Sequence, residues 1–299
     1  MIYLGRSQAV YAMSPNNPPV AHASSGSVVR FETNDCYSGK IRTCADRSSL
    51  VPWDVINPAT GPLYVTDAKA GDVLRVEIQK IEIAEQGVMS VGPNMGMLGH
   101  LIPDERTKIL PIRDGHAIFN DKLSIPCKPM IGVIGTAPAD ADIPTGTPGA
   151  HGSNMDCKRI TEGTVLYLPV NVDGALLALG DLHAAMGDGE IVICGVEIPG
   201  AVTVKVDVIK NFQAPLPMLQ TDDALICIAS AETLDKAAQA ATEHMADFLC
   251  KHLGFDIHEA GMLLSAACDL RICQMVDPLL TARMELPLWV AESYGFKMP

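Results

Sequence analysis

Hydrophobic and polar residues alternate along much of the chain, and this pattern predicts β-strands. Residues 202 to 209 show it most clearly, because valines at every second position alternate with Thr203, Lys205 and Asp207. A strand of this kind has one buried side and one solvent-facing side, which is typical of antiparallel sheet. We expect further strands at residues 28–33, 73–83, 130–135, 164–170, 175–179, 191–198 and 225–229.

The apolar positions of the longest expected strand change sides partway along it. Apolar side chains occupy even positions from Leu74 to Ile78 and odd positions from Ile81 to Ile83. One extra residue in a strand produces such a change, so we expect a β-bulge between these two parts of the strand.

The spacing of apolar residues becomes helical in the C-terminal part of the chain. Apolar residues recur three or four positions apart over residues 234–249, with Ser230 as the expected N-cap and Gly254 as the expected C-terminal stop. Asp256, with a glutamate three positions later, is typical of a capping box and predicts a second helix over residues 257 to about 272.

Together these elements predict a β-rich α+β protein with antiparallel, sandwich-like sheets. We expect one domain over residues 1–299, within which the composition shifts after the Pro-rich residues 214–217. It should be β-rich over residues 1–215, with a helical C-terminal portion over residues 216–299.

Composition favours a compact protein and makes two kinds of partner improbable. Apolar residues make up 48% of the chain and charged residues 19%, which is usual for globular proteins. The net charge of −13 opposes binding to a phosphate backbone, and no apolar run is long enough to span a bilayer. We therefore expect neither nucleic acid nor membrane as a partner.

The cysteines and the first residues bear on the cellular compartment. The nine cysteines are scattered without a CxxC pair, and the opening MIYLGRSQAV lacks the pattern of a signal peptide. Scattered thiols are typical of a reducing environment. These features predict a cytoplasmic protein.

The segment GDLHAAMGDGE, residues 180–190, carries the clearest candidate chemistry. It places His183 among three acids, Asp181, Asp188 and Glu190, between two apolar runs that we expect to be strands. Alternate residues of an extended chain share a face, and an imidazole beside carboxylates suits a divalent ion such as zinc. The alternative is an ordinary hairpin turn whose acids are solvated.

Two other polar segments follow expected strands. Asp35 comes after residues 28–33 and could be either a ligand or a turn aspartate. The long loop after residues 130–135 ends in His151, Asn154 and Asp156, which could line a site or form a turn with an Asx cap.

The sequence resembles the acetamidase/formamidase family over nearly its whole length. The motifs that carry the resemblance are GAHGSNMDCKRITEGTVLYLPV, GALLALGDLHAAMGDGE, NPATGPLYV, ETNDCYSGKI and MIGVIGTAP. Two positions depart from the family pattern: Met186 stands where many members have Gln, and Ser153 stands where Gly is usual. Serine should be tolerated at 153 unless the backbone there needs a positive φ.

The resemblance implies a β/α/β architecture, homodimers or higher homo-oligomers, a bound divalent metal and hydrolysis of short aliphatic amides to carboxylate and ammonia. We expect zinc, with calcium as the alternative. Such a reaction needs an activated water, a stabilised oxyanion and a proton for the leaving nitrogen.

The acid-bearing segments supply residues for these tasks. The expected metal ligands are Asp35, Asp156, His183 and Asp188. Glu190 would act as general base and then as acid toward ammonia, whereas His151 and Asn154 would orient the carbonyl or its oxyanion.

Three alternatives remain open at this point. Cys36 or Cys157 could be a nucleophile beside His151 or His183. The same fold could open a cyclic imide, a lactam or an ester. Ligands that close fully around the ion would instead make a non-catalytic metal-binding protein.

Overall fold

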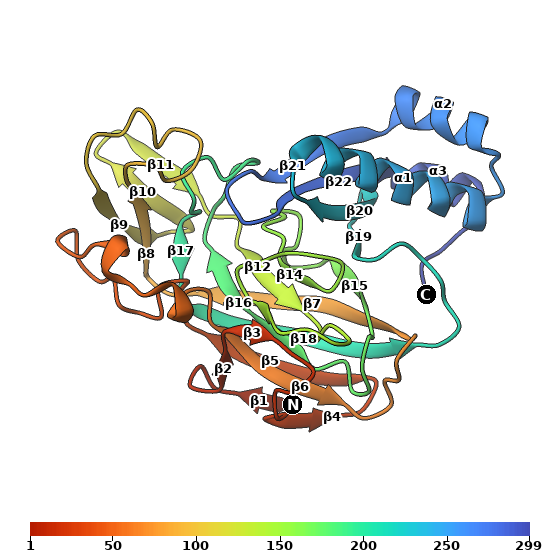
Figure 1. The fold of residues 1–299 in the computed structure, drawn as a ribbon, viewed down its shortest axis with the longest axis horizontal. Coiled ribbons are helices and arrows are strands. Elements are labelled where there is room, and N and C mark those ends of the chain that lie inside the picture. The colour runs from red at the N-terminus through yellow and green to blue at the C-terminus, as the bar shows by residue number, and fades with distance from the viewer.

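Two large β-sheets form most of the molecule (Figure 1) in a computed structural model that describes all 299 residues. In order across the sheet, the nine-stranded sheet contains β1 (Ile2–Leu4), β5 (Ser27–Thr33), β18 (Gly200–Ile209), β7 (Val73–Ile83), β15 (Val165–Pro169), β19 (Met218–Gln220), β20 (Ala224–Ala231), β22 (Leu280–Pro287) and β21 (Asp269–Gln274). All of its pairs are antiparallel except β1 with β5.

The eleven-stranded sheet holds most of the candidate site. Its main path is β11 (Leu123–Pro126), β10 (His116–Asn120), β9 (Arg106–Arg113), β8 (Gln86–Val91), β17 (Glu197–Ile198), β16 (Leu177–His183), β12 (Met130–Gly135) and β14 (Gly152–Asn154). β6 (Ala59–Val65) joins β16 to β2 (Ala9–Val10) and β4 (Ala21–Ala23). A separate two-stranded sheet pairs β3 (Ala12–Met13) with β13 (Ile143–Pro144), and two short 3-10 helices are η1 (Ser48–Leu50) and η2 (Trp53–Val55).

The main hydrophobic core lies between the two large sheets. A cluster of 36 buried residues includes Phe31 and Ile78 from the nine-stranded sheet and Leu63, Ile131 and Leu179 from the eleven-stranded sheet. Burial of apolar side chains from both inner faces is the arrangement of a β-sandwich. This confirms the predicted β-rich α+β class.

All three α-helices belong to the C-terminal part of the chain and lie beside β20 to β22 (Figure 1). They are α1 (Leu234–Leu253), α2 (Ile257–Ala267) and α3 (Leu288–Ser293). A second buried cluster of 17 residues, which includes Met245 and Phe248 of α1, packs α1 against β20 and β22. The strands beneath the helices continue the nine-stranded sheet, so the C-terminal portion is joined to the rest by backbone pairing.

Several local predictions are confirmed. Thr203 of β18 pairs with Lys80 but Val204 pairs with Ile78, so Gln79 is the extra residue of the expected bulge in β7. Gly254 ends α1 with a left-handed φ of 76°, and the Asp256 carboxylate accepts hydrogen bonds from the first turn of α2.

Four boundaries were predicted wrongly. Thr233, not Ser230, caps α1, because β20 continues to Ala231. The helix expected to reach residue 272 ends at Ala267, because the next residues form β21 and pair with β22. β16 extends to His183 through part of the segment expected to be a loop, whereas only Glu197–Ile198 of residues 191–198 form a strand.

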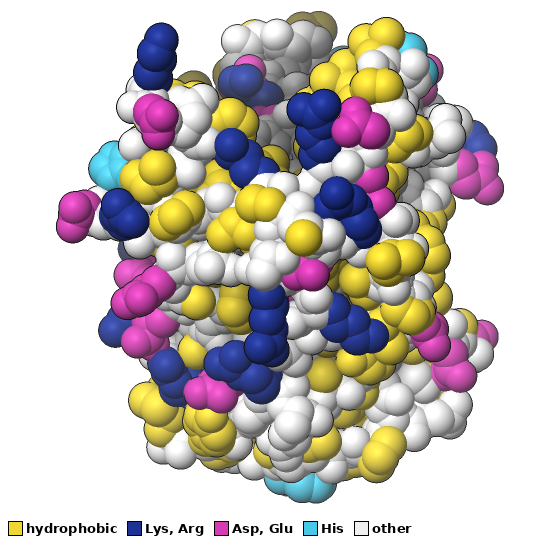
Figure 2. Space-filling model, turned by 90° about the vertical axis from the view of Figure 1, so that its left-hand side faces the viewer, with side chains coloured by type: hydrophobic (Ala, Val, Ile, Leu, Met, Phe, Trp, Pro, Cys, Tyr) yellow, Lys and Arg dark blue, Asp and Glu magenta, His cyan; other side chains and the backbone are white.

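Basic and acidic side chains are interspersed with hydrophobic ones on the face drawn in Figure 2. No helix has the length and apolar character needed to cross a membrane. All nine cysteines are free thiols.

Candidate functional site

Neighbouring strands of the eleven-stranded sheet bring His183 and Glu197 together. His183 is the last residue of β16, and the register pairs it with Glu197 at the start of β17. Residues paired in this way have adjacent side chains. His183 Nε2 lies 3.1 Å from Glu197 Oε1, and both side chains are buried.

Two aspartates, Asp181 and Asp156, also lie near the Nε2 atom of His183. His183 Nε2 is 3.7 Å from Asp181 Oδ1 and 3.8 Å from Asp156 Oδ1. Asp181 belongs to β16, and Asp156 follows β14 two strands away in the same sheet. Both aspartates have positive φ, 55° and 42° respectively, a conformation that Asp adopts more readily than most residues.

Gly132 of β12 leaves room for these two carboxylates. A Cβ atom at this position would lie 2.5 Å from Asp156 Oδ1 and 2.7 Å from Asp181 Oδ2. Both carboxylates therefore lie over the backbone of β12, where any other residue would put a side chain.

Glu190 reaches the cluster on a loop that the C-terminal strands hold in place. The N–H of Gly189 donates to the carbonyl of Cys273 at 2.8 Å, and Met275 N–H donates back to Gly189 at 3.2 Å. This short parallel bridge joins the loop to the end of β21. Donor atoms of Glu190, Asp156 and His183 all lie within 4.8 Å of one another, and all three residues are buried.

The connection between β21 and β22 adds a further acid, Asp277. Its Oδ2 accepts a hydrogen bond of 3.0 Å from Asn154 Nδ2. The buried side chain of Gln274 fixes the connection, because its Oε1 accepts from the N–H groups of Val276 and Asp277 and its Nε2 donates to Leu279 O. Asn154 therefore touches the cluster through Asp277.

Burial and mutual repulsion raise the pKa values of Asp156, Glu190, Glu197 and Asp277. Burial is the main cause in each case, and it raises the pKa of Asp156 to about 6 and that of Glu197 to about 8, partly offset by His183. Burial and the charge of Asp156 raise the pKa values of Glu190 and Asp277 well above their ordinary values.

The pKa of His183 is also raised, but for a different reason. Burial alone would lower the pKa of His183, but Glu197 and Asp181 raise it well above its ordinary value. The single imidazole thus stands near four buried acids, Asp156, Asp181, Glu190 and Glu197, and the half-buried Asp277. Several of these acids can ionise together only if further positive charge is present.

The cluster leaves many buried polar atoms without hydrogen-bond partners. They are both carboxylate oxygens of Asp156, Oδ1 of Asp181, Oε2 of Glu190, Oε2 of Glu197 and Nδ1 of His183. Buried polar atoms normally have partners, because each unpaired one costs about 1–3 kcal/mol. An imidazole nitrogen with carboxylate oxygens is a donor set that fits a divalent cation, zinc in particular.

Replacing Gly132 by alanine should disturb this arrangement directly. We expect a loss of about 1–3 kcal/mol in the free energy of unfolding, because the new methyl group must displace Asp156 and Asp181. Bound metal per chain should fall as well. Thermal unfolding and elemental analysis would measure the two effects. Gly187→Ala is the matched control, since a Cβ there meets nothing within 4 Å, and equal behaviour of the two variants would contradict this geometry.

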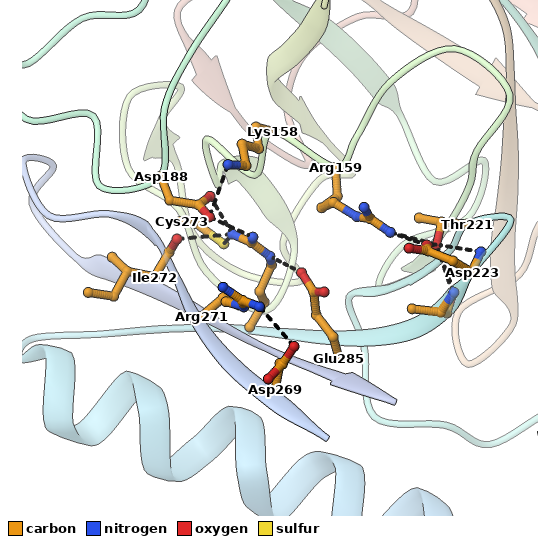
Figure 3. Close-up of polar contacts among 12 residues, drawn as sticks. Lys158, Arg159, Asp188, Thr221, Asp223, Asp269, Arg271, Ile272, Cys273 and Glu285 are labelled. Carbon is orange, nitrogen blue, oxygen red and sulfur yellow. Dashed lines mark hydrogen bonds and ion pairs between the residues drawn. The ribbon is translucent and has the colours of Figure 1, made fainter. Parts of the chain in front are cut away.

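The structure does not bring two of the predicted metal ligands into this group. Asp188 instead forms ion pairs with Arg283 at 2.8 Å and with Lys158 at 3.1 Å. Figure 3 shows Asp188 and Lys158 pointing toward one another. Asp35 Oδ1 accepts from Gly39 N–H at 2.9 Å. Asp35 also lines a separate surface cavity of about 440 Å³.

His151 directly precedes β14, and Ser153 is its middle residue. Burial lowers the pKa of His151 to about 4, so its ring is neutral at neutral pH, and its Nε2 has no partner. Ser153 has a positive φ of 72°. Serine is less favourable than glycine in this conformation. The buried Oγ of Ser153 donates to the Thr145 carbonyl at 2.8 Å, which a glycine could not do.

Three site residues were not predicted from the sequence: Gly132, Glu197 and Asp277. Glu197 had a recognisable signal, since it is the single acid within the apolar run of residues 191–198. Asp277 had none, because an aspartate before a proline is common in turns. Cys36 was considered only as a nucleophile, but it forms a second group of possible ligands with Asp181 and Glu197.

Comparisons with known proteins agree with the motifs in the sequence. The acetamidase from Bacillus halodurans is 51% identical, with a TM-score of 0.98, over 99% of this chain and 100% of its own. A recombinant predicted acetamidase/formamidase from Thermoanaerobacter tengcongensis is 46% identical, with a TM-score of 0.97, over 99% of both chains. The formamidase of Methylophilus methylotrophus is 36% identical over 129 residues, which are 39% of this chain and 32% of its own.

The match to curated relatives is partial in length, whereas the match to the family is not. The chain aligns with 65%, 32% and 16% of the length of three curated relatives, less than two thirds of each. The profile of the acetamidase/formamidase family matches residues 8–146 and 139–292. Because this match covers nearly the whole sequence, the chain belongs to the acetamidase/formamidase family.

Proposed function

We propose that the protein hydrolyses short aliphatic amides, such as formamide and acetamide, to the carboxylate and ammonia. The observation that carries the proposal is the group of Asp156, His183 and Glu190, whose buried donor atoms lie within 4.8 Å of one another in a member of this family. An amide needs an activated water and a proton for its nitrogen, and this group contains residues for both tasks.

Asp156 and His183 would hold a divalent cation, most simply zinc. Such an ion supplies a Lewis acid for the amide carbonyl and lowers the pKa of a water molecule. Both oxygens of Asp156 and Nδ1 of His183 lack protein partners, so these residues have unused donor capacity. Glu197 Oε1, held by Gly195 N–H at 2.9 Å, would orient the imidazole from the next strand.

Glu190 would move the proton. Burial and the charge of Asp156 raise the pKa of its carboxyl well above the ordinary value, which brings a carboxylate closer to the range of an effective general base. It would take a proton from water as the C–O bond forms. It would return that proton to the nitrogen as the C–N bond breaks, which releases ammonia.

A cysteine nucleophile is a weaker explanation of the same site. Burial, together with Glu197 and Asp181, raises the pKa of Cys36 well above its ordinary value, so its thiol stays protonated. Burial alone would raise the pKa of Cys157 too, but a hydrogen bond with Cys273 and the charge of Arg283 lower it. Cys157 belongs to neither group of donor atoms, which favours an activated water over a thiol.

Ammonia release with and without metal tests the proposal. The protein would be stripped with a chelator, and ammonia would be measured with formamide, acetamide and propionamide before and after zinc is restored. We expect stripping to abolish ammonia release and zinc to restore it, because Asp156 and His183 alone cannot activate water. No ammonia from any of the three amides by the zinc-loaded protein would contradict the function, and full activity without metal would contradict the role of the ion.

A further inference from the structure

We propose that Cys36, Asp181 and Glu197 form a second divalent-cation site, specific for a thiophilic ion such as zinc, beside the site of Asp156, His183 and Glu190. The inference rests on the proposed function, since it assigns a second ion to the same buried cluster. One donor atom from each of the three residues lies within 4.8 Å of the others.

Three separate elements build this group. Cys36 follows the end of β5 in the nine-stranded sheet, whereas Asp181 and Glu197 belong to β16 and β17 of the eleven-stranded sheet. All three side chains are at least nine-tenths buried, with exposed fractions of 6%, 3% and 2%. The group therefore lies at the junction of the two sheets and is not a cluster of solvated surface acids.

Unpaired atoms point to a missing ligand at this second group. Asp181 Oδ1 and Glu197 Oε2 are buried without a hydrogen-bond partner. The other oxygen of Glu197 is already engaged by Gly195 N–H at 2.9 Å and lies 3.1 Å from His183 Nε2. Glu197 thus has one oxygen directed to the first group and one oxygen left free.

The number of donors exceeds what one ion can use. A zinc ion in a protein takes about four ligands. The two groups and Asp277 together offer seven side chains: Cys36, Asp156, Asp181, His183, Glu190, Glu197 and Asp277. A second ion would use the donors that the first ion leaves over.

The identity of the donors distinguishes the two groups. The first group offers one nitrogen and carboxylate oxygens, whereas the second offers a sulfur and carboxylate oxygens. A thiolate favours zinc or a similar ion over calcium or magnesium. Binding would replace the Cys36 thiol proton, which is released to solvent. Paired ions about 3.5–4 Å apart occur in other hydrolases, where they stabilise both the attacking and the leaving atoms.

Cobalt reconstitution tests this second site without relying on activity. Metal-stripped protein would be titrated with Co²⁺, and bound metal would be counted by elemental analysis. Cobalt bound to a thiolate gives a sulfur-to-metal charge-transfer band in the near ultraviolet, whereas cobalt bound to nitrogen and oxygen does not. We expect about two cobalt ions per chain and this band for the unaltered protein.

Two cysteine variants complete the design. Cys36→Ser should lose the band and retain about one cobalt ion per chain. Cys194→Ser is the matched control and should keep both ions, because Cys194 is buried nearby but hydrogen-bonds to the backbone of Ser90 and belongs to neither group. Circular dichroism would verify that each variant is folded.

The outcomes separate this inference from the proposed function. One cobalt ion without the band in the unaltered protein, together with ammonia release, would overturn the second site and leave the function intact. A band that persists in Cys36→Ser would also overturn it. No bound cobalt at all would overturn the second site and the metal-binding role of Asp156 and His183, whereas the ammonia assay alone decides the proposed function.

Discussion

Replacing Glu190 by glutamine should lower kcat/KM for formamide and acetamide by about 10²–10⁴-fold, the range expected for loss of a general base. The amide of glutamine has nearly the same shape as the carboxyl group but cannot accept the proton that water must lose. Glu190 is buried and its Oε2 has no hydrogen-bond partner. Ammonia release measures the loss, and elemental analysis shows whether the ion is retained.

The metal content of the Glu190→Gln variant distinguishes a general base from a metal ligand, the two roles that the geometry allows for Glu190. Its donor atoms lie close enough to Asp156 and His183 to be a ligand as well as a base. Full metal content with lost turnover would identify the base, whereas metal loss in parallel with turnover would contradict that role. Glu292→Gln makes the same chemical change on an exposed residue of α3 and should alter neither quantity.

The fold was predictable wherever the spacing of apolar residues within a single strand or helix identifies that element. Alternating valines fixed the buried side of β18, and the switch of apolar positions in β7 located its bulge, because side-chain direction in a strand follows from position alone. The end of α2 was not predictable in this way. Residues 268–272 can continue a helix by their pattern, and pairing with β22 decides that they form a strand instead.

Only those site residues that lie within the family motifs were predictable. Asp156, His183 and Glu190 were identified from polar segments beside apolar strands, and the structure brings them together. Glu197 joins them through strand register, which pairs it with His183, and Asp277 joins them through the bridge between Gly189 and Gln274. Both contacts are decided by tertiary pairing, so the isolated acid in residues 191–198 marks Glu197 in the sequence but does not reveal its partner.

Asp188 shows the same limit for a residue that the sequence did single out. Its position in GDLHAAMGDGE suggests a metal ligand, but Arg283, which is 95 residues away, binds its carboxylate through two nitrogens at 2.8 and 2.9 Å. Burial alone would raise the pKa of Asp188, but Arg283 and Lys158 lower it. Asp188 therefore has ionic partners before any metal is considered.

Replacing Arg283 by methionine should destabilise the fold by about 3–5 kcal/mol, because it removes one member of a buried ion-pair network. Arg283 is 2% exposed, and besides Asp188 its guanidinium binds Glu285 at 2.6 Å and the Ile272 carbonyl at 2.9 Å. Without it, Glu285 and the Ile272 carbonyl lose their partner, and Asp188 keeps only Lys158. Arg283→Lys should recover only part of the loss, since an ammonium cannot bind Asp188 through two parallel hydrogen bonds. Denaturant unfolding would measure both variants.

Asp188→Asn then decides between the ionic and the metal-binding roles of Asp188. Asparagine keeps the size of the side chain but removes the charge that faces Arg283 and Lys158. If Asp188 serves to anchor the loop of Glu190 to β22, the variant should unfold at lower denaturant while binding as much metal as the unaltered protein. Reduced metal with unchanged unfolding would instead make Asp188 a ligand. The anchoring role is the stronger expectation, because the bidentate pair with Arg283 occupies both oxygens of Asp188 that an ion would need.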